Sequence, residues 1–309
     1  MPRFTHARAI LPLLFCTTHA AASTLEARPA AARCGAAAPA PQSPPAAAAE
    51  RIPDSQAVRG VRKMDWVWLG SPSSHYTHAA LGSPVHARSL HALVTPARGS
   101  QQLLQLELPA GQVIEDRVPR LAQLEGDGGE QIVVVESDPK RGSALVVYGL
   151  RLGAAARQPV LASLARGPYI GTPQRWLNPV GVADFDGDGR LDIAAVTTPH
   201  IGGVLTLYRY RPPLLEPGAT LSGVSNHRNG SVEQQLAAIV QRPGKRPAVI
   251  IPGTDLRTLQ AVRVDGSGQW TRQSDPLTLP APVQRITPLP GGACVLMTDG
   301  LTLQVQLQD

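Results

Sequence analysis

Short apolar runs separated by turns recur along the chain from about residue 58 onward. Many alternate apolar and polar positions or are rich in β-branched residues, which is typical of β-strands. Five times, one run is followed after a turn by a second run, and this pattern predicts five strand pairs. They are 90–95 with 102–108, 132–136 with 144–148, 193–197 with 204–210, 248–251 with 258–264, and 294–298 with 301–307. Further strand candidates lie at 118–124, 234–240 and 283–289.

The repetition of these units indicates the fold class. No convincing helical periodicity competes with it, so we expect an all-β protein. Radial repetition of small antiparallel sheets is the plan of a β-propeller. Five strand pairs indicate about five blades, and six or seven blades are the alternative.

The loop before the third strand pair carries the most informative chemistry. Asp184, Asp186, Asp188 and Asp192 occupy positions 1, 3, 5 and 9 of a nine-residue loop, with glycines at positions 4 and 6. A hard cation takes about six to eight oxygen ligands, and carboxylates packed this closely repel one another without one. We therefore predict a calcium site with these four side chains and the backbone carbonyl of Arg190 as ligands. The other interpretation is an Asp/Gly-rich turn that only connects two strands.

Two further observations define this prediction more closely: an EF-hand does not fit the loop, and the chain contains a weaker copy of it. An EF-hand is excluded because position 12 counted from Asp184 is Ala195 instead of glutamate, and because the flanking segments are predicted strands. A weaker copy of the loop lies 61 residues earlier, at 123–131, with glutamine in place of the first and last acids. Only Glu125 and Asp127 remain there, so we expect this copy to hold calcium poorly.

The intact loop, its weaker copy and the strand pairs around them resemble the FG-GAP/VCBS repeat family, the repeat class of integrin alpha-chain propellers. Longer segments within about residues 60–265 are similar to secreted bacterial FG-GAP proteins without a settled activity. These segments are 115–121, 133–138, 175–181, 199–200 and 225–228. The resemblance implies a calcium-stapled propeller outside the cytoplasm, with the four aspartates and the Arg190 carbonyl as ligands. The family usually builds propellers of more than five blades.

The N-terminus has the pattern of an export signal. Arg3 and Arg8 form a basic start, 9–15 is a short apolar run, and 20–22 offers small residues for cleavage. We predict a signal peptide at 1–22 and a periplasmic or secreted protein; a lipoprotein anchored through Cys16 is the alternative. The apolar run is too short to span a bilayer, so no transmembrane span is expected in the mature protein.

Composition divides the remaining chain. Residues 23–57 are rich in alanine and proline, which predicts a disordered linker before a propeller domain at 58–309. Export would permit Cys34 and Cys294 to form a disulfide, and the other interpretation is a buried, inert Cys294.

The charge pattern bears on partners. The formal net charge is +6, and removal of Arg3 and Arg8 with the leader lowers it to +4. The arginines are scattered along the sequence instead of clustered, so we expect no nucleic-acid binding.

Histidines are the remaining candidates for chemistry. His75, His78 and His86 lie close enough in sequence to bind a transition metal, but a polar loop is the favoured interpretation because no cysteine or carboxylate cluster accompanies them. His200 and His227 could both line a pocket on one face. The plainer interpretation is that they cap local backbone.

No recognised catalytic motif is present: the chain has no Gly-x-Ser-x-Gly elbow, phosphate loop or dinucleotide fingerprint. We therefore expect a non-catalytic binding module at the cell envelope, with a protein or glycan partner. The alternative is a calcium-dependent extracytoplasmic hydrolase or lyase that acts on a polysaccharide or a phosphoester.

Overall fold

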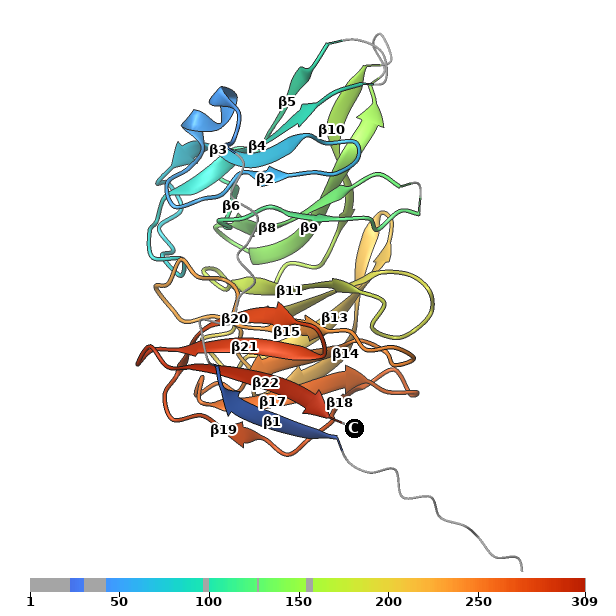
Figure 1. Cartoon of the computed structure of the whole chain (residues 1–309). Helices are drawn as coiled ribbons and strands as arrows, with labels where there is room; N and C mark the ends of the chain where they lie inside the picture. Colours follow the sequence, from blue (N-terminus) through green and yellow to red (C-terminus); the bar gives the residue numbers. More distant parts are fainter. Residues whose placement is uncertain (1–22, 31–42, 97–99, 127, 154–157, 309) are drawn as a thin grey trace, which may run out of the picture.

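The computed structural model describes residues 23–30, 43–96, 100–126, 128–153 and 158–308, and within these ranges the protein is all-β (Figure 1). The only helical element of the described residues is the 3-10 helix η1 (Ala46–Glu50). The strands follow one another in five antiparallel groups along the chain. Figure 1 shows groups 1 and 2 in the upper half of the molecule and groups 3, 4 and 5 in the lower half.

The first two strand groups are joined through neighbouring strands. Group 1 contains β2 (Val58–Arg59), β3 (Trp66–Ser73), β4 (His86–Val94) and β5 (Gln102–Glu107), paired in that order. Group 2 contains β6 (Val113–Ile114), β7 (Arg120–Ala122), β8 (Gln131–Asp138), β9 (Gly142–Leu152) and β10 (Pro159–Arg166). Strands β6 and β7 both pair with β8, which continues to β9 and β10, and β6 also pairs with β4.

The last three strand groups are also antiparallel and contain four, five and four strands. Group 3 contains β11 (Leu177–Ala183), β12 (Asp192–Thr197), β13 (Val204–Arg211) and β14 (Leu214–Ser222). Group 4 contains β15 (Ala238–Val240), β16 (Ala248–Pro252), β17 (Thr258–Val264), β18 (Trp270–Arg272) and β19 (Leu277–Thr278). Group 5 contains β20 (Val283–Leu289), β21 (Gly292–Met297), β22 (Thr302–Gln308) and β1 (Thr24–Pro29).

All five predicted strand pairs are present as adjacent antiparallel strands. They correspond to β4/β5, β8/β9, β12/β13, β16/β17 and β21/β22. The three additional candidates overlap β7, β15 and β20. The all-β prediction is confirmed.

The core lies between successive strand groups. Four large apolar clusters each combine strands of two neighbouring groups, in the order 1/2, 2/3, 3/4 and 4/5. Fully buried pairs across the four boundaries are Leu90 and Val134, Val147 and Ile193, Val196 and Val249, and Ile250 and Val295. Among the described residues, no such cluster joins groups 5 and 1.

The segment predicted as a disordered linker contains regular structure. Strand β1 pairs along its whole length with β22, from Thr24 opposite Gln308 to Pro29 opposite Leu303. The helix η1 buries Ala48 against Trp68 of β3. The linker prediction is therefore wrong at these two places, because backbone pairing to an open strand edge compensates for the low hydrophobicity of the segment.

We expect removal of residues 1–30 to destabilise the protein. The edge of β22 would lose its backbone partners and Leu25 would no longer pack on the group 4/5 cluster. The free energy of unfolding should fall by on the order of 2 kcal/mol, measured by urea titration. A variant lacking only residues 1–22 is the control, and equal stability of the two variants would show that β1 contributes nothing.

Candidate metal centre and pockets

The predicted metal loop joins β11 to β12. The chain leaves β11 at Ala183 and enters β12 at Asp192. Phe185 is fully buried in the group 3/4 cluster, edge-on to Trp270 with ring centroids 5.4 Å apart, and it anchors the loop. Gly187 and Gly189 have φ of 75° and 84°, a conformation that favours glycine.

Three of the predicted ligands converge in this loop. One carboxylate oxygen from each of Asp184, Asp186 and Asp188 lies within 4.8 Å of the others. Asp192 is only 1% exposed, and both of its carboxylate oxygens lack a hydrogen-bond partner, as does the buried Oδ1 of Asp184. Burial raises the pKa of Asp192 to about 7, with further contributions from the charges of Asp186 and Asp188. Unpartnered buried carboxylate oxygens are costly, so this arrangement fits a cation.

The outer oxygens of the loop already have partners. From β13, Arg209 pairs with Asp186 at 3.0 Å and Arg211 with Asp188 at 3.1 Å. The amide of Gly189 donates to Asp184, and the amide of Arg190 donates to Asp188. An all-oxygen donor set of this kind suits a hard ion such as Ca²⁺ or Mg²⁺. The role of the Arg190 carbonyl stays a prediction.

The weaker copy of the loop is held by the protein's own donors. Glu125 pairs with Arg151 at 2.8 Å and accepts a hydrogen bond from the hydroxyl of Tyr210. The side-chain oxygen of Gln131 accepts from two loop amides. Asp127 lies outside the described residues, so the poor calcium binding expected here stays a prediction.

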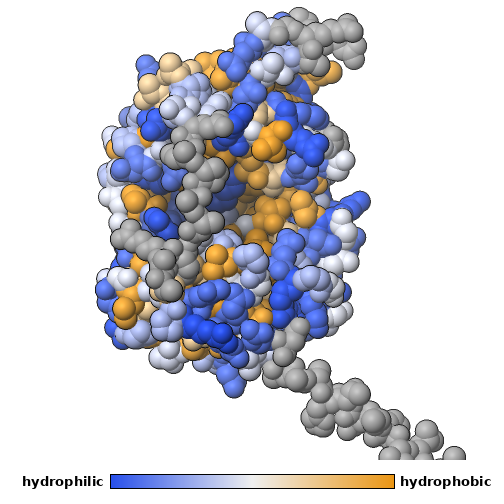
Figure 2. Space-filling model, viewed as in Figure 1, coloured by the Kyte–Doolittle hydropathy of each residue, from blue (hydrophilic) through white to orange (hydrophobic). Residues whose placement is uncertain are grey.

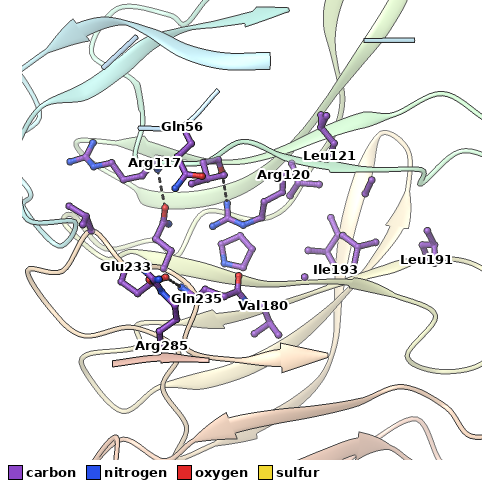
Figure 3. A pocket seen from close by; sticks show the side chains of 18 of the residues that line it. Gln56, Arg117, Arg120, Leu121, Val180, Leu191, Ile193, Glu233, Gln235 and Arg285 are labelled. Carbon is purple, nitrogen blue, oxygen red and sulfur yellow. Dashed lines mark hydrogen bonds and ion pairs between the residues drawn. The ribbon is translucent and has the colours of Figure 1, made fainter. Parts of the chain in front are cut away.

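A cavity of about 630 Å³, here called the central cavity, is one candidate binding site (Figure 3). Its walls include residues from the segment before β2, β7 and its flanking residues, β8, the β11/β12 hairpin, the segment before β15, and β20. Residues that represent these parts are Gln56, Arg120, Val180, Ile193, Glu233 and Arg285. Figure 2 shows the hollow, with apolar residues on its inner surface.

A buried polar network closes one side of the central cavity. Arg120 pairs with buried Asp116 at 2.7 Å. Gln234 donates to Asp116 at 2.9 Å and accepts from the amide of Arg117 at 3.0 Å. Asn178 donates to the carbonyls of Asn226 and Gln234. These hydrogen bonds connect group 2, group 3 and the segment before β15 beside the apolar clusters.

A second pocket, here called the histidine pocket, has a volume of about 220 Å³. Its walls include His78, Arg175, Trp176, Thr198, His200 and Asn229. The sequence indicated His200 and His227 as possible pocket residues, and the two rings are in contact, with His200 Nε2 2.8 Å from His227 Nδ1. His227 itself is buried behind His200.

The predicted cluster of His75, His78 and His86 does not converge as a metal site. His75 is exposed, and His86 is fully buried with its Nε2 donating to the carbonyl of His78. Among the described residues, the aspartate loop is the only group of three or more potential ligands close enough to hold an ion. His78 is paired with the fully buried Glu115, whose Oε1 lies 2.5 Å from His78 Nδ1, and no sequence signal indicated this pair.

Trp176 fixes the floor of the histidine pocket. It is 2% exposed, and its indole N–H donates to the carbonyl of Glu115 at 2.9 Å. Its ring stacks on His200 and meets His227 edge-on. Trp176 packs in the cluster between groups 2 and 3, which agrees with a packing role.

No family model matches this chain, and no curated protein matches it. Within the described residues, no helix is long and apolar enough to cross a membrane. Cys294 is disulfide-bonded, and both other cysteines of the chain, Cys16 and Cys34, lie outside the described residues.

We expect the substitution Asp192→Asn to have opposite effects with and without calcium. In chelator, the uncharged amide should stabilise the protein by about 1–2 kcal/mol, because it removes a buried charge beside other carboxylates. With calcium, the variant should lose more than half of the thermal stabilisation that the wild type gains. Differential scanning calorimetry in both buffers measures this, and a destabilised variant in chelator would contradict the cation interpretation.

The histidine pair predicts a second, pH-dependent effect. Burial lowers the pKa of His200 to about 4 and that of His227 to about 3. Both are below the ordinary value of about 6.5, so the unfolded chain binds more protons and stability falls as the pH drops below about 6.5. Between pH 6.5 and pH 5, each of the two rings should lower the free energy of unfolding by on the order of 1.5 kcal/mol.

Imidazole nitrogen NMR tests the assignment directly, because both rings should remain neutral at pH 5. The variant His227→Gln should show a shallower loss of stability with acid than the wild type. Protonated rings in the folded protein at pH 5 would contradict the pKa values.

Proposed function

We propose that this protein is an exported, calcium-stapled β-propeller of the FG-GAP/VCBS type that serves as a non-catalytic binding module at the cell envelope. The observation that carries the proposal is the succession of antiparallel strand groups along the chain, parts of which line one cavity. Apolar clusters between successive groups are the packing expected of propeller blades. The pairing of β1 with β22 supports ring closure, because it joins the two ends of the described chain in one blade.

The five strand groups favour five blades over six or seven. Every strand from β1 to β22 pairs antiparallel with a strand of its own group, and one parallel pairing, β10 with β14, joins groups 2 and 3. The family resemblance rests on the aspartate loop. This loop connects the antiparallel strands β11 and β12, and the sequence predicts such a strand–loop–strand arrangement for it.

Calcium is the ion that fits the proposal best. Asp184, Asp186, Asp188 and Asp192 would be the side-chain ligands, with the Arg190 carbonyl as the backbone ligand. The unpartnered oxygens of Asp184 and Asp192 support a bound cation. An ion that binds only the folded state stabilises it by mass action, by about 2.7 kcal/mol at a hundredfold excess over the dissociation constant.

Export is supported by the disulfide at Cys294, since disulfides persist mainly outside the cytoplasm. The signal peptide proposed at 1–22 lies outside the described residues, as does Cys16 of the lipoprotein alternative. In the periplasm or outside the cell, the walls of the central cavity would face a protein or glycan partner.

A calcium-dependent hydrolase or lyase is the second candidate. The His78–Glu115 pair favours it, because a buried carboxylate that orients an imidazole is a usual feature of general bases. Release of reducing or unsaturated sugar from polysaccharides, or of phosphate from phosphoesters, would support this candidate. Retention of that activity in His78→Asn would exclude His78 as its base.

We expect calcium to raise the melting temperature of the wild type by several degrees over chelator. The double variant Asp186→Ala/Asp188→Ala should show no calcium response, and Asp275→Ala, an exposed aspartate outside the loop, should respond as the wild type does. Calorimetric titration should find one tight calcium per chain. Absence of any calcium response in the wild type would defeat the metal part of the proposal.

The binding role is tested by photo-crosslinking in cell envelopes with a reactive residue at Gln235, on the cavity wall, and at Val61 as an exposed control. A defined product formed from Gln235 alone, lost in the Asp186→Ala/Asp188→Ala variant, is the expected result. Equal products from both positions would argue against a partner at the cavity.

A further inference from the structure

The histidine pocket presents two imidazole rings whose orientation and tautomers are fixed from behind. Glu115 is fully buried and accepts hydrogen bonds from the Ser137 hydroxyl and from His78 Nδ1–H, each at 2.5 Å. In the neutral ring the proton is then on Nδ1, and Nε2 carries a lone pair. Because Nε2 is hydrogen-bonded to no described residue and is not buried, this acceptor is open to the pocket.

A relay of hydrogen bonds sets His200 in the same way. His227 Nε2 must donate to the carbonyl of Ser231 at 2.9 Å, because a carbonyl only accepts. The Nδ1 of neutral His227 is therefore an acceptor and takes the Nε2–H of His200 at 2.8 Å. This leaves the lone pair on His200 Nδ1, which is again not buried and has no partner among the described residues.

Arg175 adds a charge to these two acceptors. Arg175 lines the histidine pocket, and its guanidinium donates one long hydrogen bond, 3.4 Å, to the carbonyl of Gln174. No described carboxylate pairs with Arg175, and no acidic residue lines the pocket. The amide of exposed Asn229 and the hydroxyl of Thr198 complete a polar wall.

The two imidazole acceptors and the guanidinium together favour one class of ligand. Two lone pairs require a ligand with hydrogen-bond donors, and an unpaired guanidinium favours a carboxylate. Inorganic phosphate supplies mainly acceptors, a neutral sugar leaves the guanidinium unpaired, and an ammonium group finds no carboxylate on the wall. A sugar acid supplies both hydroxyl donors and a carboxylate, and one such residue is small enough for a pocket of about 220 Å³.

We propose that the histidine pocket binds an acidic sugar residue, with ligand hydroxyls donating to His78 Nε2 and His200 Nδ1 and the ligand carboxylate on Arg175. Glu115 and His227 are positioning residues that hold the two rings. The inference deepens the glycan-binding form of the proposed function and rests on it. It concerns a site that is separate from the aspartate loop and from the central cavity.

The test uses the full-length mature protein in calcium buffer and the methyl glycosides of glucuronic and galacturonic acid as probes. The methyl glycosides of glucose and galactose, which lack only the carboxylate, are the matched neutral ligands. NMR titration should give a dissociation constant at least about tenfold lower for an acid than for its neutral partner. The Nε2 resonance of His78 and the Nδ1 resonance of His200 should move as the acid binds.

The substitution Arg175→Ala should weaken binding of the acid about tenfold and leave the neutral ligand unchanged, which a general loss of structure would not do. Arg257→Ala, an exposed arginine outside the pocket, is the matched control and should bind as the wild type does. Equal affinity for acid and neutral sugars, or an Arg175→Ala variant with unchanged affinity, would overturn the inference. So would absence of binding, or binding of Zn²⁺ at the two nitrogens in preference to the sugar acid.

These results are separable from the proposed function. The calcium response and the crosslink from Gln235 do not involve Arg175 or the two rings. A positive calcium response without acid-sugar binding would therefore reject the ligand of the histidine pocket and leave the calcium-stapled module standing.

Discussion

The burial of both faces of the middle strands is the constraint on which the rest of the structure depends. In β8, Ile132 and Val134 enter the group 1/2 cluster, while Val133 and Val135 enter the group 2/3 cluster. Alternate side chains of a strand point to opposite faces, so one strand contributes to two cores. A strand group of four or five short strands cannot bury two apolar faces alone. Groups 2, 3 and 4 therefore each bury their two faces against a neighbour on either side, and groups 1 and 5 each share one cluster.

The same constraint gathers the aspartates of the loop where they could hold a cation. Asp192 opens β12, directly before Ile193, whose side chain is fixed in the group 2/3 cluster. The register of that strand leaves the carboxylate of Asp192 almost completely buried beside the loop aspartates. Phe185 holds the other arm of the loop against Trp270. Because both arms are fixed by packing, the carboxylates cannot separate to relieve their repulsion, and arginines from β13 neutralise only the outer oxygens.

The strand pairs and the aspartate loop could be predicted from sequence because their signals are local. Alternation in strands such as 132–136 needs no knowledge of the partner strand, and the spacing of the aspartates is itself the ligand pattern. The pairing of β1 with β22 joins segments at opposite ends of the chain, so the composition of 23–57 alone suggested a linker. Glu115 was missed for the same reason, since its role depends on His78, 37 residues away. A lone buried carboxylate has no sequence signature.

Hydrogen bonds connect the strand groups where the apolar clusters end, and both pockets lie beside these hydrogen bonds. The carbonyl of Glu115 accepts from Trp176, and the amide of Arg117 donates to Gln234, so groups 2 and 3 and the approach to group 4 are fixed to one another by single, directional bonds. Buried hydrogen bonds of this kind are costly to break because both partners would be left unsatisfied. The walls of the central cavity and of the histidine pocket are built from these residues or their chain neighbours. A ligand that binds near these hydrogen-bonded residues would therefore meet several side chains that are already set in position.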